Sequence, residues 1–175
     1  MVEDYRDRVE GSQSGFEKLI GSIPGYKGYK ERELRREADR LLRTHLADRF
    51  DEQRRRLVNV MGQLTSAGRL SETVALERAN LKLQRLIDRL RTAAYGYAGL
   101  FDAIKIEQAE LDALYEFDAA LADGVDRVAE AIGAIEGLAG KGEGTSAEAN
   151  ALLNLIEELN NTLSRRVEAL SASKA

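Results

Sequence analysis

Residues 108–139, QAELDALYEFDAALADGVDRVAEAIGAIEGLA, contain the pattern that decides the fold of this chain. Apolar residues recur there at intervals of three and four, which is typical of a helix that buries one face in a bundle or coiled coil. The apolar positions are Leu111, Leu114, Leu121, Val125, Val128, Ile132 and Ile135. The segment therefore predicts a long amphipathic helix.

Asp118 falls within this apolar stripe, where another apolar residue would be expected. A polar residue at such a position can lie at the edge of a bundle, or it can specify register or oligomeric state through hydrogen bonds. The alternative is a buried carboxylate that lines a ligand pocket. The sequence leaves both interpretations open.

Three further segments show helical periodicity, at residues 28–66, 72–95 and 146–171. Thr65, Ser66 and Gly68 end the first of them, and Ser71 is the expected N-cap of the second. The glycine-rich residues 140–144 form a turn, and residues 145–148 have the spacing of a capping box. We therefore expect an all-α, antiparallel four-helix bundle (up-down-up-down) with a long first helix and an irregular N-terminal arm.

The composition suits one soluble helical domain. The chain has 175 residues, one proline, no cysteine and no tryptophan. Glycines interrupt residues 1–25, which predicts an N-terminal arm, and residues 26–175 are expected to form a single bundle domain. No apolar run reaches the roughly 18 residues of a membrane span, and the charged start lacks a secretory signal. A cytoplasmic protein without a transmembrane segment is expected.

Charge is distributed unevenly along the chain. Residues 27–100 carry 17 Lys or Arg and 10 Asp or Glu, whereas residues 101–150 carry 3 and 12. Either basic and acidic helices pack beside one another, or a solvated face is unevenly charged. The alternative is a charge-complementary contact between subunits or with a partner. On the first helix we expect ion pairs one turn apart, which are Glu31–Arg35, Asp39–Arg43, Asp51–Arg55 and Glu52–Arg56.

The first helix is predicted to be longer than the second, roughly 55 Å against roughly 35 Å at about 1.5 Å per residue. Its apolar stripe also changes phase near Leu41 and Leu42. The helix must therefore overhang the bundle or bend. An overhang would expose a basic stretch at residues 27–43.

Catalytic and metal-binding patterns are absent from the sequence. A di-iron bundle needs Glu-x-x-His on two helices, but the single histidine, His45, follows Leu42 at that spacing. There is no nucleophile elbow and no phosphate-binding loop. We therefore predict no catalytic, cofactor-binding or metal-binding residue, and we interpret His45 as a packed or half-buried side chain.

Aromatic residues mark one end of the predicted bundle. If the helices alternate in direction, the start of the first helix and the second connection lie together. The candidate partner surface there comprises Tyr26, Lys27, Tyr29, Lys30, Arg32, Tyr95, Tyr97 and Phe101. Tyrosines beside cations suit recognition of a protein. The alternative is an aromatic plug that closes the bundle and fixes the arm.

These features predict a non-catalytic interaction module, such as an adaptor, scaffold or regulatory subunit, that binds a protein partner or forms a homo-oligomer. Nucleic acid is disfavoured, because residues 27–56 include seven acidic side chains beside eleven basic ones. The alternative function is a bundle that binds a small ligand or metal through Asp118 and His45, with or without enzymatic use.

Overall fold

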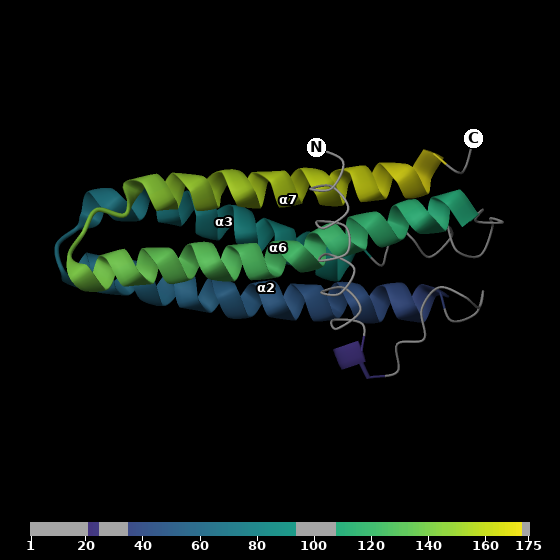
Figure 1. The fold of residues 1–175 in the computed structure, drawn as a ribbon, viewed down its shortest axis with the longest axis horizontal. Helices are drawn as coiled ribbons and strands as arrows, with labels where there is room; N and C mark the ends of the chain where they lie inside the picture. The colour runs from purple at the N-terminus through teal and green to yellow at the C-terminus, as the bar shows by residue number, and fades with distance from the viewer. Residues whose placement is uncertain (1–20, 25–34, 94–107, 173–175) are drawn as a thin grey trace, which may run out of the picture.

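The computed structural model describes residues 21–24, 35–93 and 108–172, and four helices account for most of them. They are α2 (Arg35–Ser66), α3 (Leu70–Thr92), α6 (Gln108–Lys141) and α7 (Ser146–Ala172) (Figure 1). Within these ranges there is no β-strand. The helices alternate in direction along the chain, so the predicted four-helix bundle is confirmed.

The bundle consists of two helical hairpins, α2–α3 and α6–α7, that lie side by side (Figure 1). The main contacts between the hairpins join α2 to α6 and α3 to α7. Because each hairpin is antiparallel and both hairpin turns lie at the same end (Figure 1), these neighbours from different hairpins run parallel to one another. The helices α3 and α6, which follow each other in sequence, therefore lie across a diagonal.

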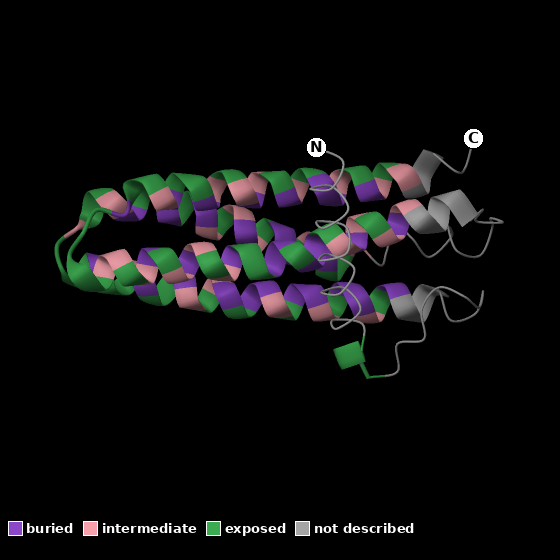
Figure 2. Ribbon diagram, viewed as in Figure 1, coloured by how far each residue is buried: buried purple, intermediate pink, exposed green. Residues whose placement is uncertain are grey.

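The core lies along one stripe of each helix, and Figure 2 shows the buried residues in purple. The buried stripe residues are Leu46, Phe50, Leu57, Val60 and Leu64 of α2, Leu76, Ala79, Leu83, Leu86 and Leu90 of α3, Leu114, Leu121, Val125, Val128, Ile132 and Ile135 of α6, and Leu152, Ile156, Leu159 and Leu163 of α7. Leu42 is also buried, whereas Leu41 is half-buried. Alternating spacings of three and four thus identified most of the core.

The turn between α2 and α3 forms where the sequence predicts it. Gly68 has a φ of +74°, a left-handed conformation that favours glycine, and the Arg69 N–H donates to the Leu64 carbonyl at 2.9 Å. Helix α3 then begins at Leu70 with Arg69 at the N-cap position and no side-chain cap hydrogen bond. The expected N-cap at Ser71 is therefore wrong, because the helix begins one residue before it.

Glu72 joins the two turns at this closed end of the bundle. Its carboxylate accepts hydrogen bonds from the Thr145 N–H at 2.8 Å and the Thr145 hydroxyl at 2.9 Å. Arg69 donates to the same carboxylate through Nε at 2.6 Å and Nη2 at 2.8 Å. In a capping box, the Thr145 N–H would instead donate to the carboxylate of Glu148. A carboxylate on α3 therefore replaces the expected local cap of α7.

Stability at acidic pH should depend on Glu72. Its hydrogen bonds from Arg69 and Thr145 lower its pKa from 4.5 to about 2. A carboxylate whose pKa falls on folding stabilises the protein fully above pH 4.5 and loses that contribution between about pH 4.5 and 2. Glu72→Gln should therefore lower the free energy of unfolding at pH 7, and the deficit should shrink as the pH falls through this window. Urea unfolding at pH 7, 4.5 and 3 measures it.

Glu148→Gln is the matched control, because it neutralises the carboxylate that a local capping box would use. This variant should stay close to the wild-type protein at each pH. A deficit in Glu72→Gln that is the same at pH 7 and pH 3 would contradict the assignment of the shifted pKa to the Glu72 contacts.

The N-terminal arm is described only at residues 21–24, where Ile23 is buried against the core. This one residue of the arm therefore packs on the bundle. The expected domain boundary between residues 25 and 26 falls within residues 25–34, which lie outside the described part of the chain. No described helix combines the length and the hydropathy that a membrane crossing requires.

Candidate interaction surface

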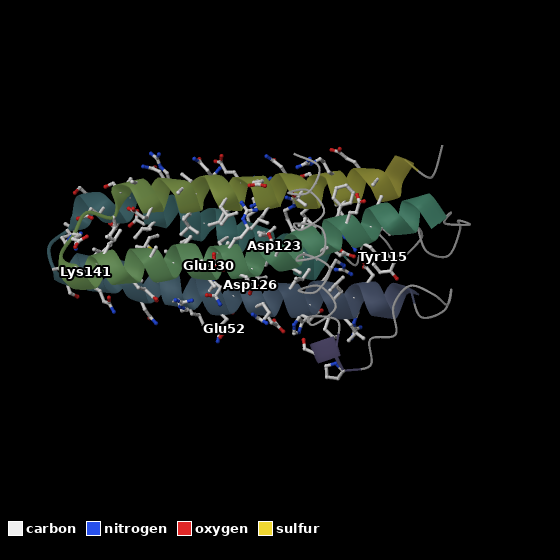
Figure 3. The ribbon with its side chains drawn as sticks, in the orientation of Figure 1. Glu52, Tyr115, Asp123, Asp126, Glu130 and Lys141 are labelled. Atoms are coloured by element: carbon white, nitrogen blue, oxygen red, sulfur yellow. The ribbon has the colours of Figure 1, made fainter. Side chains whose placement is uncertain are left out.

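The aromatic surface predicted from the sequence lies outside the described residues. This applies to all its members, which are Tyr26, Lys27, Tyr29, Lys30, Arg32, Tyr95, Tyr97 and Phe101. Tyr115 and Phe117, the aromatics of α6 near that end, are half-buried (Tyr115 is labelled in Figure 3). This part of the prediction therefore stays a prediction.

Asp118 is fully buried and binds an arginine from another helix. Arg166 of α7, which is also fully buried, donates through Nε to the Asp118 carboxylate at 2.7 Å. The same guanidinium donates through Nη2 to Asp39 of α2 at 2.6 Å. Arg166 thus crosses the diagonal of the bundle and ties three helices together. Asp118 is therefore not at the bundle edge.

The charged cluster continues along α2. Asp39 also accepts a hydrogen bond from Arg43 Nε at 2.8 Å, and Arg43 Nη1 donates to the Leu90 carbonyl of α3 at 2.7 Å. These four charged residues form what we call the buried charge network: Asp39, Arg43, Asp118 and Arg166. It holds two positive and two negative charges, so its formal charge is zero. All four helices contribute at least a backbone group to it.

The network corrects two expectations about α2. Asp39–Arg43 is indeed an ion pair one turn apart, but both side chains are buried rather than exposed. Arg43 therefore does not belong to an exposed basic stretch at residues 27–43. Buried ion pairs stabilise little relative to apolar side chains, but they are costly to break and can specify one arrangement of helices.

His45 is half-buried beside the core, as the sequence indicated. Its Nε2 is buried without a hydrogen-bond partner among the described residues. Burial lowers the pKa of the imidazole, and Arg49 lowers it further, whereas Asp48 raises it. Among the described residues, no group of three His, Asp or Glu side chains could hold a metal ion.

The uneven charge of the sequence is partly satisfied between α2 and α6. Arg56 binds Glu136 through two hydrogen bonds of 2.6 and 3.3 Å, and Arg49 lies 3.8 Å from Asp126. Figure 3 labels Asp126 and Glu130 on the acidic side of α6. Basic and acidic helices therefore pack beside one another, as one of the interpretations proposed.

The contacts of α2 also test the ion pairs that were expected one turn apart on this helix. Asp51–Arg55 is confirmed, with 2.7 Å between Nη2 and Oδ2. Glu52–Arg56 is wrong, because the Arg56 guanidinium reaches across to Glu136 and to Gln53. Glu31 lies outside the described residues.

Large apolar side chains reach the surface on only one of the two described hairpins. Leu70, Val74 and Leu81 of α3 are 60%, 49% and 69% exposed, and Val58 of α2 is 43% exposed. On α6 and α7 no large apolar side chain is comparably exposed within the residues whose burial is described. The outside of the α2–α3 hairpin therefore differs chemically from that of α6–α7.

The α2 side of this hairpin is also free of charge near the turn. Residues 57–68 contain no acidic or basic side chain in a sequence that is 32% charged. A shallow, open hollow on this stretch is lined by Val58, Asn59, Gly62, Gln63, Ser66 and Ala67. Gly62 leaves the hollow open, because nothing lies within 4 Å of where its Cβ would be. We call this hollow, together with Leu70, Val74 and Leu81, the hairpin face.

The hairpin face was not singled out from the sequence, although a signal for it was present. Leu70, Val74 and Leu81 fall between the positions of the buried α3 stripe and are therefore out of phase with it. Scattered exposed apolar residues are normal in soluble proteins, whereas a grouping of them on one element suggests contact with a partner.

Comparison of the chain with protein-family profiles, curated proteins and solved structures finds no match.

Proposed function

We propose that this protein is a non-catalytic, cytoplasmic interaction module that binds a protein partner through the hairpin face. The observation that carries the proposal is the exposure of Leu70, Val74 and Leu81 along one helix, beside a charge-free stretch of its neighbour. Covering such side chains removes apolar area from water, at about 25 cal/mol per Å².

The interior of the bundle supports the same proposal. The two carboxylates of the buried charge network are engaged within the core, since Asp118 and Asp39 both bind Arg166. The carboxylate that could have lined a ligand pocket is therefore neutralised by a side chain of the same chain. Among the described residues, the large apolar side chains that are exposed to solvent lie on the outside of the α2–α3 hairpin.

Leu81→Asp should abolish recognition, because it places a charge where the partner covers an apolar side chain. The full-length chain serves as bait in a crosslinked pull-down from source-cell lysate, with and without nuclease, and mass spectrometry identifies the bound protein. Binding of the purified partner is then measured by calorimetry. We expect the partner to resist nuclease and to bind Leu81→Asp roughly tenfold more weakly, or not at all, since about 1.4 kcal/mol corresponds to a factor of ten.

Ala134→Asp is the matched control, because Ala134 is exposed on α6 and the substitution adds the same charge to the other hairpin. It should bind like the wild-type protein. Equal binding by Leu81→Asp and the wild-type chain would exclude the hairpin face. Loss of capture on nuclease treatment would instead favour nucleic acid.

A further inference from the structure

The α7 side of α3 carries a row of cations. Arg78, Lys82 and Arg85 recur at spacings of four and three, so they fall within an arc of about 60° around the helix at 3.6 residues per turn. Arg78 and Arg85 are exposed, and their side chains make no ion pair or hydrogen bond within the described part of the chain. Lys82 pairs with Glu157 of α7, but 42% of its side chain is exposed. We call these three cations the basic row, which lies beside the hairpin face.

The outer side of α6 carries a row of carboxylates with the same spacing. Asp123, Asp126 and Glu130 are separated by three and four residues, and Figure 3 labels all of them. All three are exposed, and among the described residues Asp123 and Glu130 make no side-chain ion pair or hydrogen bond. Asp126 lies 3.8 Å from Arg49 of α2, with 72% of its side chain exposed. We call these three carboxylates the acidic row.

The two rows lie at the same heights along the bundle. Arg69, at the start of α3, donates to the Ala139 carbonyl of α6, so these two residues are level. The basic row lies 9, 13 and 16 residues after Arg69, and the acidic row lies 9, 13 and 16 residues before Ala139. Leu90 and Asp118, each 21 residues from the same starting points, meet at the buried charge network, so the heights still agree there. Since α3 and α6 run in opposite directions and both rise about 1.5 Å per residue, each cation is level with one carboxylate.

The two rows cannot meet within one chain, because α3 and α6 lie across a diagonal. The contact of Lys82 with α7 places the basic row on the α3–α7 side of the bundle, and the contact of Asp126 with α2 places the acidic row on the α2–α6 side. These two sides are opposite one another. When two copies lie side by side in the same orientation, the α3–α7 side of one meets the α2–α6 side of the next. The pairs that are then level are Arg78–Glu130, Lys82–Asp126 and Arg85–Asp123.

From this complementarity we infer that copies of this chain associate side by side, with the basic row of one copy against the acidic row of the next. The contact is heterologous, because each copy uses one surface for one neighbour and the opposite surface for the other. Assembly is therefore not limited to a dimer. Opposite charges at three matched heights set the orientation and the register, and no row meets its own copy. This inference is separate from the proposed function, which concerns the hairpin face.

Charge reversal tests the contact. Sedimentation velocity of the full-length chain at low salt should show species larger than a dimer that grow with concentration. Raising the ionic strength from about 0.01 M to about 1 M shortens the Debye length from about 30 Å to about 3 Å and should dissociate them. Arg78→Glu with Arg85→Glu, or Asp123→Arg with Glu130→Arg, should weaken association about tenfold or more. An equimolar mixture of these two variants should assemble again, because each contact then joins one variant to the other.

Disulfide trapping tests the register, since the natural chain has no cysteine. Arg78→Cys and Glu130→Cys are oxidised separately and as a mixture, and the other two charge pairs remain in each variant. The mixture should give a covalent dimer of one chain of each kind. Each variant alone should give much less, because the two rows lie on opposite sides of a copy and identical positions do not meet. Equal crosslinking of each variant alone would overturn the heterologous contact.

Other outcomes also decide the inference, and circular dichroism verifies that each variant is folded. A wild-type chain that stays monomeric at low salt at all concentrations overturns it. It is equally overturned if both reversal variants assemble like the wild-type chain, or if their mixture stays monomeric. Arg165→Glu, which reverses an exposed charge on α7, is the control and should assemble like the wild-type chain. A purified partner that binds the wild-type chain but not Leu81→Asp would support the proposed function in either case.

Discussion

Replacing Arg166 with alanine should destabilise the bundle by about 3–5 kcal/mol, which is the usual cost of removing one partner from a buried ion pair. The substitution removes the buried guanidinium that binds both Asp118 and Asp39. Two buried carboxylates then lose their shared cation. Urea unfolding at pH 7, followed by circular dichroism, measures the loss.

Two further variants serve as controls for the Arg166→Ala prediction. Arg165→Ala removes the neighbouring, exposed arginine, and it should change stability by no more than about 0.5 kcal/mol. Exchanging all four members of the buried charge network for apolar residues of similar size should leave stability near that of the wild-type protein, or raise it. If Arg166→Ala costs less than about 1 kcal/mol, the network does not hold the helices together.

Ile132→Asp should unfold the protein. Ile132 is fully buried on α6 within the apolar core. An unpaired buried charge costs several kcal/mol, which is comparable to the total stability of a typical domain, about 5–15 kcal/mol. Circular dichroism should show loss of helix, and size-exclusion chromatography should show an expanded or aggregated species.

Ala134→Asp adds the same carboxylate to the same helix on its exposed side, and it should remain folded. If Ile132→Asp keeps the helical signal and the unfolding midpoint of the wild-type chain, the assignment of the buried face of α6 is wrong. Comparison of the two variants therefore shows whether unfolding results from the burial of the new carboxylate or from the added charge alone.

Periodicity predicted most of the fold because every helix buries a single stripe. Leu111 to Ile135 on α6 showed the pattern most clearly, and the stripes on the other helices agreed with it. The pattern did not predict which helices are neighbours across the two hairpins. A stripe records that a helix has a buried side, but it contains no information about which helix covers that side.

The sequence predicted only part of the buried charge network. Asp118 was noticed because it interrupts an apolar stripe. Arg166 lies three residues after Leu163 and so continues the α7 stripe, but an apolar pattern alone favours its half-buried neighbour Val167 at this turn. Two opposite charges at stripe positions of different helices were the available signal.

Asp39 and Arg43 were misplaced for a different reason. A carboxylate and a guanidinium four residues apart usually form an exposed pair on one helix. Their burial follows from Arg166 of α7, which reaches Asp39 from a helix 127 residues further along the chain. Spacing along α2 alone could not distinguish these two environments.

The division of the bundle into two hairpins also orders the events of folding. Contacts within α2–α3 and within α6–α7 join segments that are close in sequence, and such contacts form quickly. Asp39 and Arg166 can meet only after the hairpins have docked, because closing so long a loop costs more entropy. Interactions made after the transition state act mainly on the unfolding rate. The hairpins thus set how fast the bundle assembles, and the buried charges set how long it persists.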